Sequence, residues 1–109
     1  MIINGNLEIF SNDRLISLGE LKSVNGFFNL YRCKNIKSLG NLIFVNGFLN
    51  LNDCENLEDL GDLEEVKEFI YLENTKITKS KFWELKPKLM HKCIWEHNQD
   101  YIYENDFQI

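Results

Sequence analysis

The strongest constraint on the fold is a repeat of about 21 residues that covers most of the chain. Residues 24–30 (VNGFFNL) match residues 45–51 (VNGFLNL) at a shift of 21. Weaker copies lie one turn earlier, from Ile3, and one turn later, from Val66. A fixed period in the twenties is typical of stacked units, none of which can bury its apolar face alone. The repeat therefore predicts a solenoid of four turns over residues 1–79.

Each turn contains a short apolar-x-apolar core, and this alternation predicts a strand whose core residues point inward. We expect these strands to stack as a parallel sheet, with the leucines of the following segments forming further apolar columns inside the stack. Asn29 and Asn50 are expected to satisfy backbone groups within the repeat and not to form a site. The core pairs are Leu7/Ile9, Phe28/Leu30, Leu49/Leu51 and Ile70/Leu72.

The two best repeats resemble the cysteine-containing kind of leucine-rich repeat. Their shared pattern, apolar-x-L-x-x-C-x-x-I/L, occupies residues 28–36 and 49–57. The first and fourth turns depart from it, because Asn12 and Thr75 stand in place of the cysteine. The resemblance implies an α/β-type repeat solenoid with a curved parallel sheet whose concave face binds other proteins. It does not imply which protein.

Aromatic side chains recur at the outward positions of the predicted sheet. Three phenylalanines one turn apart would lie about 4.8 Å from each other on adjacent strands. An exposed aromatic column of this kind is typical of a binding patch. The sequence leaves open the alternative that the rings stack as structure or are covered by the C-terminal segment. The predicted partner-binding residues are Phe27, Phe48 and Phe69, with Tyr31, Tyr71 and Phe10 enlarging the patch.

Residues 80–109 leave the repeat and are predicted to cap it within the same folded unit. Thr78 is a suitable N-cap for a short helix, which Pro87 should interrupt or restart. Residues 93–96 and 101–104 alternate as two strands of a β-hairpin would. The many aromatic side chains of this segment suit a cap over the last repeat, and a second binding surface is the alternative.

The repeat begins almost at Met1, so the sequence predicts no N-terminal cap. An uncapped stack would leave a strand edge and apolar side chains facing water, which proteins usually avoid. We therefore predict self-association as a homodimer through the first turn, by way of Ile3, Leu7 and Ile9.

Charge is segregated along the chain, whose net charge is −5. Residues 53–73 hold nine acidic side chains against Lys67, and residues 76–92 hold six lysines against Glu84. Such runs are most often solvated faces. They also leave a nucleic-acid-linked alternative, in which the lysines contact phosphates or the acidic run imitates them. Steep salt dependence of binding would favour that alternative.

Chemistry-bearing motifs are not recognisable in the chain. It contains no phosphate loop, no G-x-S-x-G elbow and no H-E-x-x-H helix, so we expect no catalytic, metal or cofactor site. His91 and His97 match no metal-ligand spacing. The three cysteines lack a C-x-x-C pair and are expected to be reduced, with Cys33 and Cys54 inside the stack.

The leading hypothesis is a small protein-interaction module. The N-terminal residues lack the features of a signal peptide, and no apolar run is long enough to span a bilayer, so the expected location is cytoplasmic, without a membrane partner. The small size and the architecture would suit an inhibitor, an immunity protein or a viral counter-defence factor. An enzyme is not expected.

Overall fold

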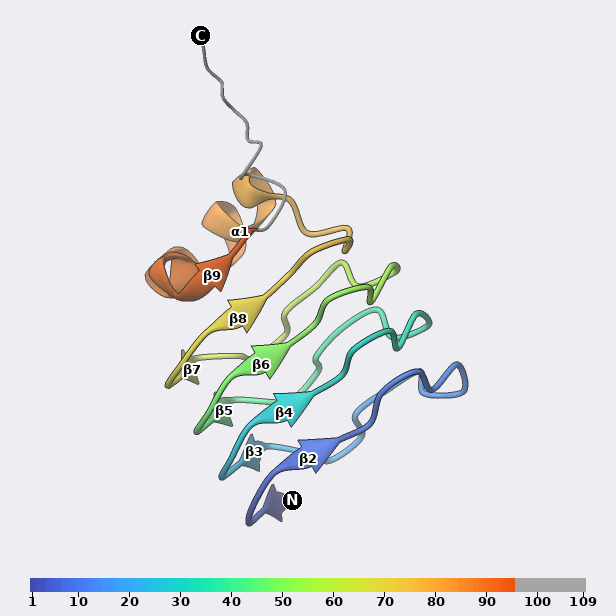
Figure 1. Ribbon diagram of the computed structural model, residues 1–109. Helices are drawn as coiled ribbons and strands as arrows, with labels where there is room; N and C mark the ends of the chain where they lie inside the picture. The colour runs from blue at the N-terminus through green and yellow to red at the C-terminus, as the bar shows by residue number, and fades with distance from the viewer. Residues whose placement is uncertain (96–109) are drawn as a thin grey trace, which may run out of the picture.

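The structure, a computed structural model that describes residues 1–95, is built from stacked turns of 21 residues (Figure 1). Each of the four turns contributes two short strands, and each strand pairs in parallel with its equivalent one turn away. One sheet consists of β1 (Ile2–Ile3), β3 (Ser23–Val24), β5 (Phe44–Val45) and β7 (Glu65–Val66). The other consists of β2 (Leu7–Glu8), β4 (Phe28–Asn29), β6 (Leu49–Asn50), β8 (Ile70–Tyr71) and β9 (Cys93–Ile94).

The second sheet is the parallel stack predicted from the apolar-x-apolar cores, and the first sheet is an additional parallel sheet that the sequence did not indicate. Each strand of the first sheet supplies a single inward apolar residue, such as the buried Val24 or Val45, before the chain bends, so no apolar-x-apolar pattern marks it in the sequence. A bend at Gly47 separates β5 from β6. A Cβ atom at Gly47 would lie 2.8 Å from the backbone nitrogen of Phe27, so only glycine lets the two turns approach this closely.

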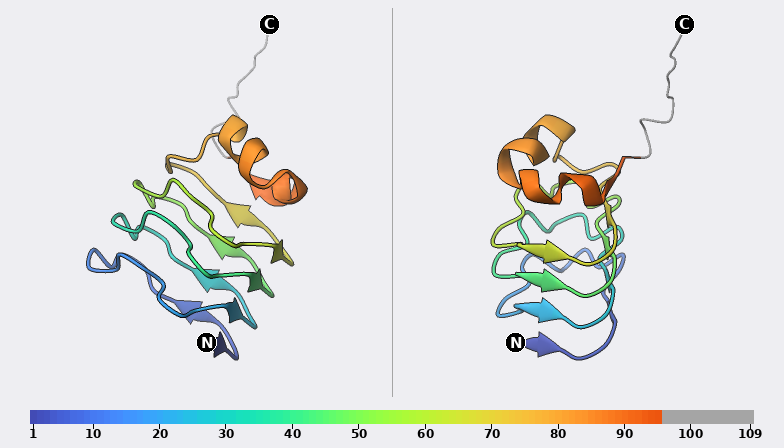
Figure 2. Two further views of the ribbon diagram at one scale, coloured as in Figure 1. Left: turned by 180° about the vertical axis from the view of Figure 1, so that it is seen from behind. Right: turned by 90° about the vertical axis from the view of Figure 1, so that its left-hand side faces the viewer.

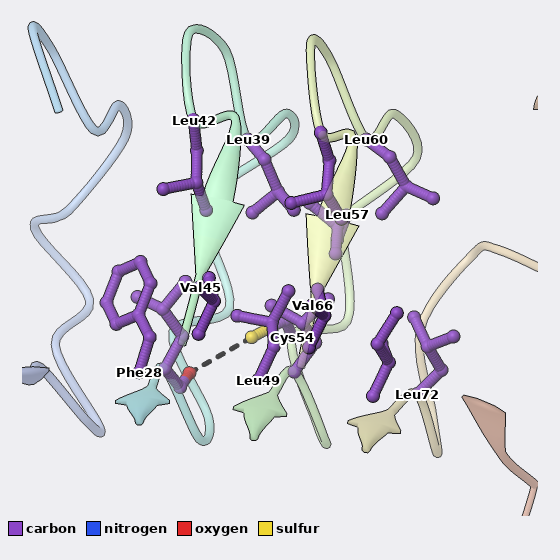
Figure 3. Close-up of a cluster of buried hydrophobic side chains, with 14 of the residues drawn as sticks. Phe28, Leu39, Leu42, Val45, Leu49, Cys54, Leu57, Leu60, Val66 and Leu72 are labelled. Carbon is purple, nitrogen blue, oxygen red and sulfur yellow. Dashed lines mark hydrogen bonds between the residues drawn. The ribbon is translucent and has the colours of Figure 1, made fainter. Parts of the chain in front are cut away.

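The core consists of apolar columns that run through the stack. The inward residues of the second sheet are fully or almost fully buried in the second to fourth turns, as the alternation predicted. Figure 3 shows further columns meeting them, formed by Val45 and Val66, by Leu39 and Leu60, and by Leu57. Within residues 1–95 the buried side chains include no polar or charged group. Burial of apolar surface is thus the main stabilising contribution within the stack.

The C-terminal part of the described chain covers one end of the stack (Figure 2). Helix α1 (Lys79–Leu85) begins where the sequence predicted, because the Thr78 hydroxyl accepts a hydrogen bond from the Lys81 backbone N–H at 3.2 Å. A 3-10 helix, η1 (Pro87–Lys92), follows it. Phe82 and Leu89 are buried in the core cluster, so both helices close the apolar end of the stack.

The predicted strand at residues 93–96 appears as β9. It lies parallel to β8, with Ile70 opposite Cys93, and extends the second sheet. The second arm of the predicted hairpin, residues 101–104, lies outside the described residues.

Candidate partner-binding face

The outward positions of the second sheet form one continuous surface, which we call the binding face. Their side chains are half-buried or exposed, whereas the alternating residues Phe28 and Leu30 have no exposed surface. In Figure 1 the strands β2, β4, β6 and β8 that carry this face are turned toward the viewer, and the described cap lies beyond β8. The face comprises Asn6, Phe27, Phe48 and Phe69, then Glu8, Asn29, Asn50 and Tyr71, then Phe10, Tyr31, Asn52 and Glu73.

An aromatic stack lies at the centre of the binding face. The rings of Phe27 and Phe48 are parallel within 4°, with centroids 4.7 Å apart, close to the strand spacing expected from the repeat. Tyr71 meets Phe48 edge to face at 6.1 Å. Both phenylalanines remain half-buried, so the stack is accessible as well as mutually packed. The described cap does not cover it.

The outer aromatic residues of the prediction lie on the same face but outside this stack. Phe69 is 51% exposed and Phe10 is 54% exposed. Tyr31 is half-buried, with the Arg32 guanidinium 5.9 Å from its ring centroid. The predicted ladder of three phenylalanines is thus a stacked pair, Phe27 and Phe48, with Phe69 and the tyrosines beside it.

A set of asparagines adjoins the aromatic stack and satisfies backbone groups as expected. The Oδ1 atom of Asn29 accepts from the Tyr31 backbone N–H at 3.0 Å, and that of Asn50 accepts from the Asn52 N–H at 3.0 Å. Asn52 Oδ1 accepts from the Glu73 N–H of the next turn at 2.7 Å. Sequence reasoning missed the consequence that the amide NH2 groups, turned away from these bonds, belong to the binding face.

The predicted self-association residues lie at the end of the stack opposite the cap. Ile3, Leu7 and Ile9 are half-buried, although their equivalents in the second turn are fully buried. The neighbouring Ile2 is 62% exposed. Among residues 1–95, β1 and β2 each pair with a strand on one side only.

The cysteines are structural. Cys33 and Cys54 are buried free thiols, and each Sγ donates to a carbonyl of the preceding turn, Ile9 at 2.7 Å and Leu30 at 3.1 Å (Figure 3 shows the second bond). Burial raises the pKa of Cys54 to about 12 and also raises that of Cys33. Neither thiol is therefore a nucleophile at neutral pH.

Within residues 1–95 no ion pair joins the acidic run to the lysine-rich segment. The two ion pairs found within residues 1–95 join Asp13 to Lys34 and Glu65 to Lys67, so neither links the acidic run to the lysine-rich segment. The lysines are spread over the cap and the loop before it. Lys86 and Lys88 line a pocket of about 440 Å³ between the cap and residues 63–64.

Two kinds of feature are absent from the described part of the chain. Residues 1–95 hold no group of three His, Cys, Asp or Glu side chains placed to bind a metal ion. Neither of their helices has the length and apolar character needed to cross a bilayer. No protein-family model, no curated protein and no solved structure matches this chain.

Proposed function

We propose that this protein is a leucine-rich-repeat-like solenoid that binds another protein through the binding face. The solenoid assignment is supported by the register, because residues 21 apart pair in parallel in every turn of the repeat. The binding assignment rests on one observation, the half-exposed Phe27–Phe48 stack at the centre of a sheet face that the described cap leaves open. Aromatic rings bury much surface at a low entropic cost and are favoured anchors at protein interfaces.

The test is a Phe27→Ser/Phe48→Ser double variant. We expect it to remain folded, because both rings are only half-buried and an aromatic pair contributes about 0.5–1.5 kcal/mol beyond its buried area. It should lose a protein that the wild type captures from cell lysate. Capture is compared by pull-down, and folding by circular dichroism.

The matched control is Phe44→Ser, which removes a half-buried phenylalanine from the first sheet. It should keep the captured protein. Unfolding of the double variant would make the stack structural, and unchanged capture would place the interface elsewhere.

The nucleic-acid-linked alternative is supported by the lysine-rich segment. Within residues 1–95 none of its six lysines forms an ion pair with the acidic run. A phosphate-binding surface releases counterions, so its affinity should fall by about tenfold or more between low and physiological salt. Binding through the aromatic stack should change much less, which separates the two classes in one titration.

We also propose that two copies associate through their first turns. The cap closes the other end of the stack, so contact between first turns would give a closed two-fold dimer and not a filament. Light scattering at micromolar concentration should report the dimer mass for the wild type and the monomer mass for Ile2→Lys. The control Trp83→Lys alters an equally exposed residue of the cap and should remain dimeric. A monomeric wild type would rule out the proposal.

A further inference from the structure

A pocket of about 440 Å³ lies where the cap meets the stack, and none of the twelve positions of the binding face lines it. The cap is the pair of helices α1 and η1, which close one end of the stack (Figure 2). Pockets that enclose organic ligands measure about 300–1,000 Å³, so this one has room for a large apolar side chain. Its lining consists of Leu63 and Glu64 from the stack and of Leu85, Lys86, Pro87, Lys88 and Leu89 from the cap.

The backbone on both sides of the pocket is fixed by the fold. On the cap side, the Lys86 carbonyl accepts a hydrogen bond from the Leu89 N–H at 3.0 Å, and Pro87 between them has a fixed φ. On the stack side, the Glu64 N–H donates to the Ile43 carbonyl of the preceding turn at 2.9 Å. A pocket whose walls are already in place avoids the entropic cost of ordering them when a ligand binds.

The lining combines apolar side chains with two lysines. Leu63 and Leu89 are almost fully buried, whereas Leu85 keeps 36% of its surface exposed. Within residues 1–95 the ammonium groups of Lys86 and Lys88 form no ion pair and no hydrogen bond. The pocket thus offers a ligand apolar surface together with two positive charges.

These features favour a ligand that has both an apolar group and carboxylates. The lysine-rich segment, residues 76–92, holds six lysines against Glu84 and attracts negative charge to this end of the molecule. A nucleic acid fits less well, because Glu64 lines the stack side of the pocket and belongs to the acidic run, residues 53–73, which repels phosphates. A short protein segment can keep its carboxylates on the cap side and place one apolar side chain in the pocket.

We propose that this pocket holds an apolar side chain of a partner protein, whose neighbouring carboxylates contact Lys86 and Lys88. The site is separate from the binding face and does not depend on the function proposed for that face. With both sites in use, the solenoid bridges two proteins, one on its open sheet and one at its cap.

Random peptides displayed on phage are the probe, selected on the wild-type protein. Selection should enrich peptides in which carboxylates flank a leucine or an aromatic side chain. Such a peptide is then synthesised with a fluorescent label, and its affinity is measured by anisotropy. Replacing its apolar residue with serine should weaken binding by about tenfold or more. The Phe27→Ser/Phe48→Ser variant should bind the peptide as the wild type does.

The deciding variant is Lys86→Gln/Lys88→Gln, which removes both charges from the pocket. Neither side chain is fully buried, so the fold should be retained, and circular dichroism checks this. The variant should bind the labelled peptide about fivefold more weakly, because two ion pairs near the surface are lost. The matched control Lys79→Gln/Lys81→Gln removes the same charge from exposed positions of α1 outside the lining and should lose much less affinity.

Four results would overturn the inference. The first is a selection that enriches no acidic peptide, and the second is equal affinity in the two lysine variants. The third is tighter peptide binding by Glu104→Gln/Asp106→Asn, which would show that carboxylates of the chain's own C-terminal segment occupy the site. The fourth is displacement of the peptide by a random single-stranded oligonucleotide that the pocket variant no longer binds, which would assign the site to nucleic acid. Capture through the binding face is measured separately, so none of these results decides the proposed function.

Discussion

Leu49→Ala should lower the free energy of unfolding by about 2–5 kcal/mol, because it opens a cavity among columns that have no exposed surface. Leu7 occupies the equivalent position in the first turn, where it pairs with Phe28 of the second turn. It is only half-buried. Leu7→Ala should therefore lower the free energy of unfolding by clearly less than Leu49→Ala does. Both variants are compared with the wild type by urea denaturation followed by circular dichroism.

This comparison holds for the monomer, so light scattering must first show that the protein is monomeric under the conditions of the measurement. An equal decrease in the free energy of unfolding for the two variants would mean that the first turn is buried as deeply as the third. The apolar core would then extend through the first turn instead of ending there.

Alkaline pH should destabilise the protein through its buried thiols. The ordinary thiol pKa is 9.0, and burial raises that of Cys54 to about 12. Below pH 9.0 the thiol is protonated in both states, and the stabilising contribution of the neutral form is fully present. As the pH rises toward 12 the unfolded state loses its proton first, so the contribution is lost by about 1.4 kcal/mol per pH unit.

The variant Cys54→Ala isolates this effect from the titration of other groups. The stability of the wild type should fall more steeply with pH than that of the variant, and the difference should be confined to the range between pH 9.0 and about 12. Urea denaturation at a series of pH values gives both curves. Parallel curves would show that the folded thiol titrates as it does in the unfolded chain.

The stacking of the turns could be predicted from the sequence because it depends on residues that are equivalent at one fixed period. Phe28 pairs with Leu49, and Asn29 with Asn50, at the shift of 21 that the sequence comparison yields. The inward columns follow from the same alternation. The start of α1 was also predictable, since capping by Thr78 is a local interaction within one turn of helix.

The candidate site was predictable only in part. The aromatic column and its spacing follow from the repeat, and the Phe27–Phe48 stack has the expected geometry. Phe69 lies outside the stack because of side-chain packing, which the 21-residue period does not determine. The donor groups of the face were also missed, because the amide orientation of Asn52 is set by the Glu73 N–H of the following turn.

By itself, then, the sequence determined the period, the inward columns and the helix boundary, all of which arise from residues at regular or neighbouring positions. Only the tertiary structure decided the rest. Each strand of the first sheet has one inward residue and so shows no alternation, and beside it Gly47 leaves room for the backbone of Phe27 in the preceding turn. The pairing of β9 with β8 joins a non-repetitive segment to the last turn. These features depend on the contacts between turns in space, which no local pattern records.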